Sequence, residues 1–433
     1  MSMSLAVAER AASPADLRKG GKYLVIAGAS FNLALCFIST RHWVHVGNPL
    51  IALVEIMIMG TGFYMIRNRI DRPAFWIIAV TVGFLLGAKL VNPAISFKIV
   101  HDVGIMYIFY GLGRMATERT ARSTIWIIMV LVLLVGFMEL VLTGLYSQMF
   151  NIWDYYVQKG VIASDTVNYS NTNLFLSGNR GAAASRTFFQ SIFGSHRVSS
   201  IFLEPDSLGN FSAIVFAWCL SVSRNQPGRR YVALYGLSVL CFILADSRFA
   251  SGCCAAMLLL RLSPFCKMPM VSFILPILVA TALTLVGSMH ELPGVLPAII
   301  NDDFSGRLVF SGRLLDYWNV GQWFALAPSQ VYTADTGYAY VLNNLGAILT
   351  LFYLGLFSFR RPLTHEGAIM KSMISVYFAT SLCIGASVFT IKTAALLWFL
   401  YGVTETIRPA KTWRPAPKMA WAGRAGPLPG AAI

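Results

Sequence analysis

Residues 124–146 read Thr124-Ile-Trp-Ile-Ile-Met-Val-Leu-Val-Leu-Leu-Val-Gly-Phe-Met-Glu-Leu-Val-Leu-Thr-Gly-Leu-Tyr146, an apolar run in which Glu139 is the one charged residue. A bilayer core about 30 Å thick needs about 20 apolar residues per helix, so this run predicts a membrane-spanning helix. The composition agrees, because 56% of the 433 residues are hydrophobic and only 12% are charged. Soluble domains carry about 25% charged residues. The sequence therefore predicts an all-α polytopic membrane protein.

Eleven further runs resemble this one in length and apolar content. They cover residues 23–40, 44–66, 73–91, 99–115, 208–223, 231–247, 248–262, 269–288, 337–358, 372–389 and 391–407. The run at 99–115 is weakened by His101 and Asp102, and the last two runs are separated by hardly any loop. We therefore expect about twelve spans, with ten to twelve as the range.

The positions of the basic residues predict the orientation of these spans. Most of the 34 Lys and Arg residues fall on one side if the N-terminus is inside: in 1–22, 67–72, 114–122, 224–230, 261–267, 360–371 and the tail. Loops rich in Lys and Arg stay in the cytoplasm. We predict a multi-pass membrane protein with both termini cytoplasmic. The net charge of +15 then reflects topology and anionic lipid, and not nucleic acid.

This topology divides the chain into a membrane domain with two tails and two long external loops. The cytoplasmic N-terminal tail is 1–22, the transmembrane domain is 23–407, and the basic tail 408–433 is predicted to be disordered. The two long external loops are 147–207 and 289–337. The first contains an irregular stretch, 170–186, and an aromatic segment, 187–194, that suits a short interfacial helix. In the second, 306–318 suits an amphipathic helix.

Several kinds of chemistry have no sequence signal here. The seven cysteines lie almost entirely inside apolar runs and none is in the two long loops, which leaves no disulfide framework and no cysteine-based metal site. The sequence contains no Walker loop, dinucleotide fingerprint, HExxH motif or Gly-x-Ser-x-Gly elbow. No cytoplasmic loop is long enough for a nucleotide-binding domain. We therefore expect a substrate that is outside the cell or held in the membrane.

Charged residues from separate segments converge on the predicted external face. They are Arg197, Glu204 and Asp206; Asp246 and Arg248; Arg307, Arg313 and Asp316; and Asp335 with Asn343 and Asn344. Ionisable groups at a membrane bundle are costly unless they are paired or solvated, which makes them candidates for function.

Each group also has a structural interpretation. Arg197 could be an ordinary loop charge, and Asp206 or Ser207 could be the N-cap of the following helix. Asp246 could pair with Arg248, and Arg313 with Asp316 three residues later. Arg307 and Arg313 could instead bind lipid head groups.

The pair His101 and Asp102 could form a proton relay or a sodium site within the fourth span. We favour the alternative that it lies at the outer end of that span.

Four motifs, in this order, resemble those of the O-antigen polymerase/ligase superfamily, with Wzy-type exopolysaccharide polymerases, such as xanthan polymerase, the nearest branch. They are Arg197-Val-Ser-Ser-Ile-Phe-Leu-Glu-Pro-Asp-Ser-Leu-Gly-Asn210, Asp246-Ser-Arg-Phe-Ala-Ser-Gly252, Gly312-Arg-Leu-Leu-Asp-Tyr-Trp318 and Asp335-Thr-Gly-Tyr-Ala-Tyr-Val-Leu-Asn-Asn-Leu-Gly346. They cover roughly 190–350, and the remainder of the chain is similar in topology only. The ligase branch has a histidine where Asp335 stands here, which favours polymerase over O-antigen ligase.

The resemblance implies a glycosyltransferase related to the GT-C architecture. It would move a growing chain from undecaprenyl pyrophosphate to the next lipid-linked repeat unit at the periplasmic face of the bacterial inner membrane, without a metal or nucleotide cofactor. The external loops 147–207 and 289–337 would then be periplasmic. A flippase and chain-length or export proteins are the implied partners. Arginine stabilises a leaving pyrophosphate, which assigns Arg197, Arg248, Arg307 and Arg313 to the diphosphate. Asp246 would help to bind substrate.

A sugar hydroxyl that attacks an anomeric carbon needs a base. Glu204 and Asp335 are the candidates for that role.

Two other classes of function are weaker. A transporter or flippase of lipid-linked oligosaccharide predicts paired repeats and broken helices, neither of which the sequence indicates. An exopolysaccharide acyltransferase predicts a catalytic histidine within the membrane, and His101 lies away from the charged groups along the chain.

Overall fold

The computed structural model describes residues 14–70, 72–163, 173–174, 196–222, 228–289, 304–329, 331, 333 and 336–407. The described residues form helices and no β-strand, which confirms the all-α class. The α-helices are α1 Pro14–Thr40, α2 Asn48–Ile66, α3 Arg72–Val91, α4 Lys98–Met115, α5 Glu118–Val141, α6 Thr143–Met149, α7 Ile152–Gln158, α9 Pro205–Val222, α10 Arg229–Leu244, α11 Arg248–Leu262, α12 Pro269–Ser288, α13 Phe304–Asp316, α14 Val320–Trp323, α15 Gly337–Phe359, α16 His365–Ser381 and α17 Ile391–Thr404. Short 3₁₀ helices are η1 Arg67–Arg69, η4 Ser200–Phe202, η5 Pro264–Lys267 and η6 Ser387–Phe389.

The long helices follow the predicted apolar runs one for one. Five helices in the described part of the chain are long and apolar enough to cross a membrane: Lys19–Thr40, Asn48–Arg69, Glu118–Val141, Pro269–Ser288 and Gly337–Phe359. The others among the twelve are shorter or carry more polar residues. The chain is therefore a helical protein with several segments that can span a bilayer, and the count of twelve spans stays a prediction.

Two helices begin earlier than the predicted apolar runs that they contain. Helix α1 begins at Pro14, so the second half of the predicted N-terminal tail is helical, and Lys22 at its end donates to Ser123 Oγ at 2.8 Å. Helix α16 begins at His365 rather than at residue 372, because the Thr364 hydroxyl caps it by accepting from Gly367 N at 2.9 Å. The chain after α16 forms a turn and η6, so the last two long helices are separated by a real connection.

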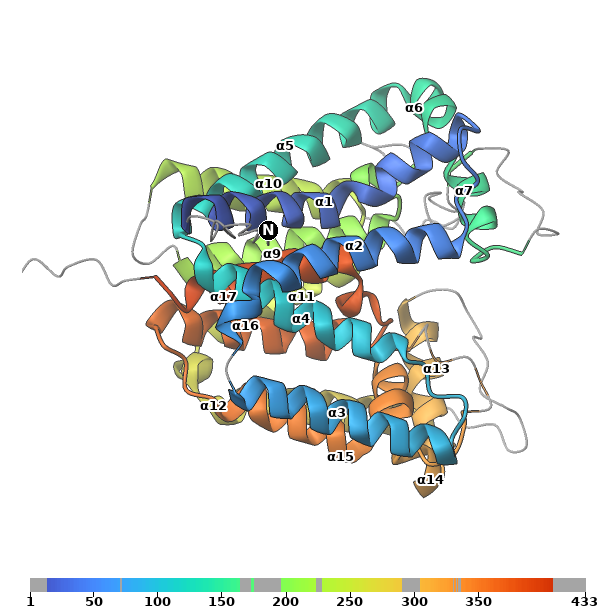
Figure 1. Ribbon diagram of the computed structural model, residues 1–433, viewed down its shortest axis with the longest axis vertical. Coiled ribbons are helices and arrows are strands. Elements are labelled where there is room, and N and C mark those ends of the chain that lie inside the picture. The colour runs from blue at the N-terminus through green and yellow to red at the C-terminus, as the bar shows by residue number, and fades with distance from the viewer. Residues whose placement is uncertain are drawn as a thin grey trace, which may run out of the picture.

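The helices lie side by side in a layered stack, as Figure 1 shows. Helices α9, α16 and α17 form the middle, with α1, α5 and α10 on one side and α3, α12 and α15 on the other. Every residue of α17 is buried, as are nearly all residues of α9. A helix that is covered all round belongs in the interior of a bundle. The centre of the protein is therefore this pair, α9 and α17.

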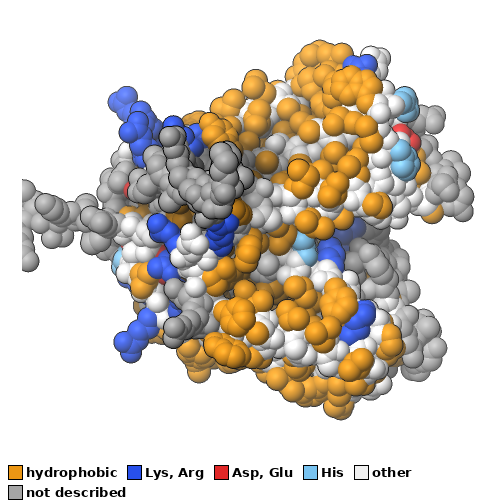
Figure 2. Space-filling view, viewed as in Figure 1, with side chains coloured by type: hydrophobic (Ala, Val, Ile, Leu, Met, Phe, Trp, Pro, Cys, Tyr) orange, Lys and Arg blue, Asp and Glu red, His pale blue; other side chains and the backbone are white. Residues whose placement is uncertain are grey.

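The short helices α7, α13 and α14 gather at one end of the stack (Figure 1). Lys and Arg side chains are concentrated at the opposite end on the visible face, where Figure 2 shows most of the blue surface. This separation is the one that the distribution of basic residues predicted. We call the end with α7, α13 and α14 the outer end; its placement outside the cell stays a prediction.

The two predicted external loops are partly structured. The first contributes α6, α7 and η4, and the second contributes α13 and α14, so the amphipathic helix predicted at 306–318 is confirmed. Most of 170–186 and all of 187–194 lie outside the described residues.

Helix α13 packs closely on α12 because both have a glycine at the crossing. A Cβ on Gly287 would lie 2.1 Å from the Gly312 carbonyl carbon, and one on Gly312 would lie 2.0 Å from Leu283 O. Small residues at a crossing let helix backbones approach within a membrane. This contact fixes the next residue, Arg313, against the bundle.

Helix α15 is broken at Gly346, which has φ 68° and ψ 163°. Only glycine adopts such a backbone without strain, and here a Cβ would lie 2.8 Å from Phe324 O. The break gives room to the chain that follows α14. The sequence reading that no helix is broken is thus wrong for α15.

Candidate functional site

The segment 196–203 leads into α9 and is fixed to α5 by Glu139, which is fully buried. Its carboxylate accepts from Ser199 N at 2.9 Å, from Ser200 N at 2.5 Å, and contacts His196 Nε2 at 2.7 Å. Within this segment Ser200 has φ 54° and Leu203 has φ 63°. Sequence reasoning missed Glu139; the signal available was a lone carboxylate near the outer end of the apolar run 124–146.

Arg197 is anchored at both ends of its guanidinium. Its Nε donates to Ala245 O at 3.0 Å and its Nη2 to Asp206 Oδ1 at 3.0 Å. The side chain is only 19% exposed, so the interpretation of Arg197 as a solvated loop charge is wrong. Arg197 joins the end of α10 to the start of α9.

Asp206 does not cap α9, contrary to one sequence interpretation. The helix begins at Pro205, and Glu204 O accepts from Ser207 N at 3.2 Å and from Leu208 N at 3.3 Å. Asp206 and Ser207 therefore lie inside the first turn, and Glu204 is the residue that precedes the helix. Asp206 pairs with Arg197 instead.

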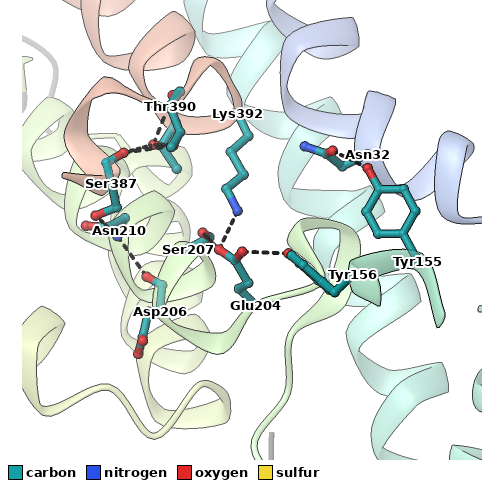
Figure 3. A network of polar contacts seen from close by, with 11 residues as sticks. Asn32, Tyr155, Tyr156, Glu204, Asp206, Ser207, Asn210, Ser387, Thr390 and Lys392 are labelled. Carbon is teal, nitrogen blue, oxygen red and sulfur yellow. Dashed lines mark hydrogen bonds and ion pairs between the residues drawn. The ribbon is translucent and has the colours of Figure 1, made fainter. Parts of the chain in front are cut away.

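Glu204 lies at the centre of a separate polar network, drawn in Figure 3. Lys392 extends from α17 and forms an ion pair with Oε2, which also accepts from Ser207 Oγ at 2.8 Å. Tyr156 of α7 donates to Oε1 at 2.5 Å. Three elements far apart in sequence thus meet at one carboxylate. Lys392 and Tyr156 were missed by sequence reasoning. The signal available for Lys392 was a lone charged residue in the first turn of the predicted span 391–407.

These contacts decide the charge of Glu204. Burial raises the pKa of the carboxyl, but the ion pair with Lys392 and the bonds from Lys392 and Tyr156 outweigh burial and lower its pKa to about 2. Burial and the nearby Glu204 raise the pKa of Tyr156 well above its usual value, so the phenol stays neutral and donates. Glu204 is therefore an anion at every physiological pH.

A second lysine lies within electrostatic range of this network. Lys159, just after α7, has its pKa lowered by burial and by the repulsion of Lys392, while Glu204 and Glu55 act in the opposite direction. Its Nζ lies 5.5 Å from the centre of the Tyr156 ring. Two lysines, Lys159 and Lys392, thus lie within electrostatic range of Glu204.

Asn210, one turn into α9, connects the network to η6 and α16. Its Nδ2 donates to Asp206 O at 2.9 Å and to Ser387 Oγ at 3.1 Å, and its Oδ1 accepts from Tyr377 OH at 2.9 Å. Figure 3 shows Asn210 and Ser387 beside the Glu204 network. All of the polar groups of this amide are satisfied, so Asn210 holds α9 in place.

Asp246 and Arg248 occupy the reversal between α10 and α11. Asp246 is buried and has φ 48°, and Ser247 caps α11 by accepting from Ala250 N at 3.2 Å. Arg248 is the first residue of α11 and is half-buried. The reversal lies against the segment 196–203, since Ala245 O accepts from Arg197 Nε. The structure thus brings this predicted pair beside the Arg197 segment.

Arg313 in α13 is 1% exposed and is one of the largest fully buried side chains. Its Nε and Nη2 have no hydrogen-bond acceptor among the described residues. The predicted alternative that Arg313 pairs with Asp316 is wrong, because Asp316 is exposed and accepts nothing from it. Arg307, earlier on the same helix, is half-buried. A buried guanidinium without an acceptor is costly, and an anion would satisfy it.

Asp335 lies outside the described residues, and the asparagines near it are structural. Asn343 Oδ1 accepts from Ser329 N at 3.2 Å, and Asn344 Oδ1 accepts from Ser96 N at 3.0 Å. They connect the chain after α14 and the chain before α4 to α15.

His101 and Asp102 lie near the start of α4, so they lie near one end of that predicted span, and the placement of that end outside the cell stays a prediction. Asp102 is buried and accepts from Tyr340 OH at 2.7 Å, while His101 Nε2 lies 3.4 Å from Glu55 Oε2. Glu55 also raises the pKa of Lys159, as Glu204 does. His101 is therefore nearer to the Glu204 network than its place in the sequence indicates.

The described residues contain no group of three His, Cys, Asp or Glu side chains that could hold a metal ion. All seven cysteines are free and buried.

Comparisons with protein families, with curated proteins and with solved structures found no match to this chain.

Proposed function

We propose that this chain is a polymerase of bacterial exopolysaccharide, a glycosyltransferase that uses lipid-diphosphate sugars at the periplasmic face of the inner membrane. The proposal includes twelve spans, a GT-C-like architecture and cytoplasmic termini. Its motifs resemble those of the O-antigen polymerase/ligase superfamily in the region that holds Arg197, Glu204 and Arg313. The observation that carries the proposal is the buried guanidinium of Arg313 without an acceptor.

A lipid diphosphate suits Arg313 for two reasons. The guanidinium offers parallel N–H donors that match phosphate oxygens and keeps its charge when buried. In the transition state the leaving diphosphate gains negative charge, and donors that are already dry and fixed stabilise that charge more than water does. Arg307 lies earlier on the same helix and is a second candidate donor to the diphosphate. Arg248, the first residue of α11, is a third candidate.

In the proposed reaction, an acceptor sugar hydroxyl oxygen bonds to the anomeric carbon of the donor. The bond from that carbon to the diphosphate oxygen breaks, and its electron pair leaves with the lipid diphosphate. The hydroxyl proton passes to a carboxylate, for which Glu204 is the candidate within the described residues and Asp335 the one outside them.

With its pKa at about 2, Glu204 is a weak base while Lys392 holds it. A diphosphate near Lys392 competes for the ammonium group, raises the pKa of Glu204 and makes it a better base. Lys392 thereby couples donor binding to proton abstraction.

A deletion strain complemented with variants tests the proposal. We expect Arg313→Ala, Arg248→Ala and Lys392→Ala to lose polymer and to accumulate single repeat units on the lipid diphosphate. Arg67→Ala is the matched control, because Arg67 stacks on Tyr64 at 3.9 Å at the opposite end of the bundle. Full polymer in all three variants would refute the site. Repeat units that stay on the cytoplasmic side would favour a flippase, and polymer that forms but is not transferred to lipid A core would favour a ligase.

A further inference from the structure

A long apolar groove runs between helices α2, α3 and α4. It has a volume of about 690 Å³ and is lined on α2 by Ile56, Gly60 and Phe63 and on α3 by Ile78 and Val82. Several lining side chains are open to the surroundings; Ile56 is 61% exposed and Phe63 47%. In Figure 2 the surface between the two halves of the molecule is furrowed, with hydrophobic side chains on both sides.

The inner wall of the groove has few free polar groups. Thr81 of α3 and Tyr353 of α15 hydrogen-bond to each other through their hydroxyls, and Thr81 Oγ1 also donates to Ile77 O at 2.7 Å. Because these hydroxyls are satisfied, the groove favours a hydrocarbon rather than a sugar. A pocket of this size is within the range of about 300–1,000 Å³ that small-molecule ligands occupy.

Two lysines lie just beyond the lining residues at the outer end of the groove. Phe97 and His101 line it there, at the start of α4. Lys89 Nζ lies 4.7 Å from the centre of the Phe97 ring, and Lys98 Nζ lies 5.9 Å from the centre of the Tyr340 ring. An apolar channel that ends beside two lysines matches a molecule with a hydrocarbon chain and an anionic head.

Charges at the same end interact electrostatically with Lys159, which also interacts with Glu204 and Lys392. Lys98 and Lys392 lower the pKa of Lys159, and Glu55 and Glu204 raise it. Glu55 in turn lies beside His101, with Oε2 at 3.4 Å from Nε2. A head group beside Lys98 would therefore lie within the field of the candidate site.

We propose that the α2–α4 groove binds the polyprenyl tail of a lipid-linked sugar, with its phosphate beside Lys89 and Lys98. This rests on the proposed function for the identity of the lipid. A single groove suits a single linear chain, whereas a diacyl phospholipid would leave its second chain outside. Arg313 does not line the groove. Because a polymerase joins two lipid-linked molecules, the reaction requires a second lipid-binding site.

Photocrosslinking of the full chain in lipid nanodiscs tests this proposal. The probe is a polyprenyl phosphate with a diazirine in its chain, and crosslinked peptides are mapped by mass spectrometry. We expect crosslinks in α2 and α4 that undecaprenyl phosphate removes and phosphatidylglycerol does not. Equal competition by phosphatidylglycerol would overturn the proposal and mark the groove as a bilayer-lipid site.

Two glycine variants make the test specific. A Cβ at Gly60 meets nothing within 4 Å, so Gly60→Phe fills the groove without a clash on the backbone. We expect crosslinking to fall about tenfold, the change that about 1.4 kcal/mol produces. Gly87→Phe is the control, because Gly87 is as open but does not line the groove. Undiminished crosslinking in Gly60→Phe would overturn the proposal.

The crosslink does not depend on sugar transfer, so its result is distinct from that of the proposed function. Specific crosslinks in a chain without polymerase activity would support the groove and refute the polymerase alone. Polymerase activity that is unchanged in Gly60→Phe, with no crosslinks in α2 or α4, would refute the groove alone.

Discussion

The Glu204 network and Arg313 are two charged regions of the same predicted outer end, and they differ in one respect. Every oxygen of Glu204 has a donor, from Lys392, Ser207 or Tyr156. Arg313 is more deeply buried, yet two of its nitrogens have no acceptor among the described residues. A satisfied network stabilises the resting protein, whereas an unsatisfied buried charge reduces its stability. The contrast supports the proposed role of Arg313 in binding an anionic ligand.

Of substitutions in these two regions, one at Arg313 should lower activity the most and stability the least. We expect Arg313→Met to reduce polymerisation by about 10²–10³-fold, as for the loss of one fixed transition-state donor. Its thermal stability in detergent should stay equal or rise, because a buried charge without a partner is removed. Arg41→Met, an exposed arginine after the outer end of α1, is the control and should change neither. A strongly destabilised Arg313→Met would show that its charge is satisfied in the resting protein.

The opposite behaviour is expected at Lys392. Lys392→Met leaves Glu204 partly buried without its ion pair, which should cost about 3 kcal/mol in free energy of unfolding and also lower activity. The double variant Lys392→Met with Glu204→Gln should recover part of the stability but none of the activity. Thermal unfolding and polymer assays on all four chains form a double-mutant cycle. Additive losses in that cycle would mean that the two side chains do not interact.

Glu139 is a third buried charge at this end and, like Glu204, it is satisfied. It holds the segment 196–203, which carries Arg197. Glu139→Gln places an amide against donors, and we expect a loss of about 1–3 kcal/mol. Faster hydrogen exchange in 196–203 is the direct readout. Glu118→Gln, at the other end of the same helix, is the control: its carboxylate accepts from Tyr231 OH at 2.5 Å and should leave exchange in 196–203 unchanged. Equal exchange in both variants would argue against Glu139 as the anchor.

The smallest expected effect is the pH dependence that Glu204 contributes. Its pKa is lowered from 4.5 to about 2, so its contribution to stability is fully present above pH 4.5 and is lost as pH falls toward 2. We expect a contribution of about 2 kcal/mol, measured as the difference between wild type and Glu204→Gln. Melting temperatures from pH 7 to pH 3 would measure it. A difference that grows as pH falls would contradict the ion pair with Lys392.

The sequence predicted the positions of the long helices well, because each is a continuous apolar run between polar or basic segments. It failed where local signals compete: Thr364 starts α16 early, and Gly346 breaks α15. For the site, it selected Arg197, Glu204, Asp246, Arg248, Arg307 and Arg313 as charges near predicted helix ends. It did not predict the pairs that form, in which Arg197 binds Asp206 and Glu204 binds Lys392.

The sequence by itself determined that the protein is helical, rich in segments that can span a membrane, and asymmetric in its basic charge. These properties follow from composition and periodicity along the chain, which need no knowledge of neighbours. Only the tertiary structure decided which charges are satisfied. Lys392 reaches Glu204 from 188 residues away, Glu139 holds Ser199 from 60, and Arg313 is enclosed by the α12–α13 crossing. Burial and pairing depend on helices that meet in space, and no local pattern encodes those meetings.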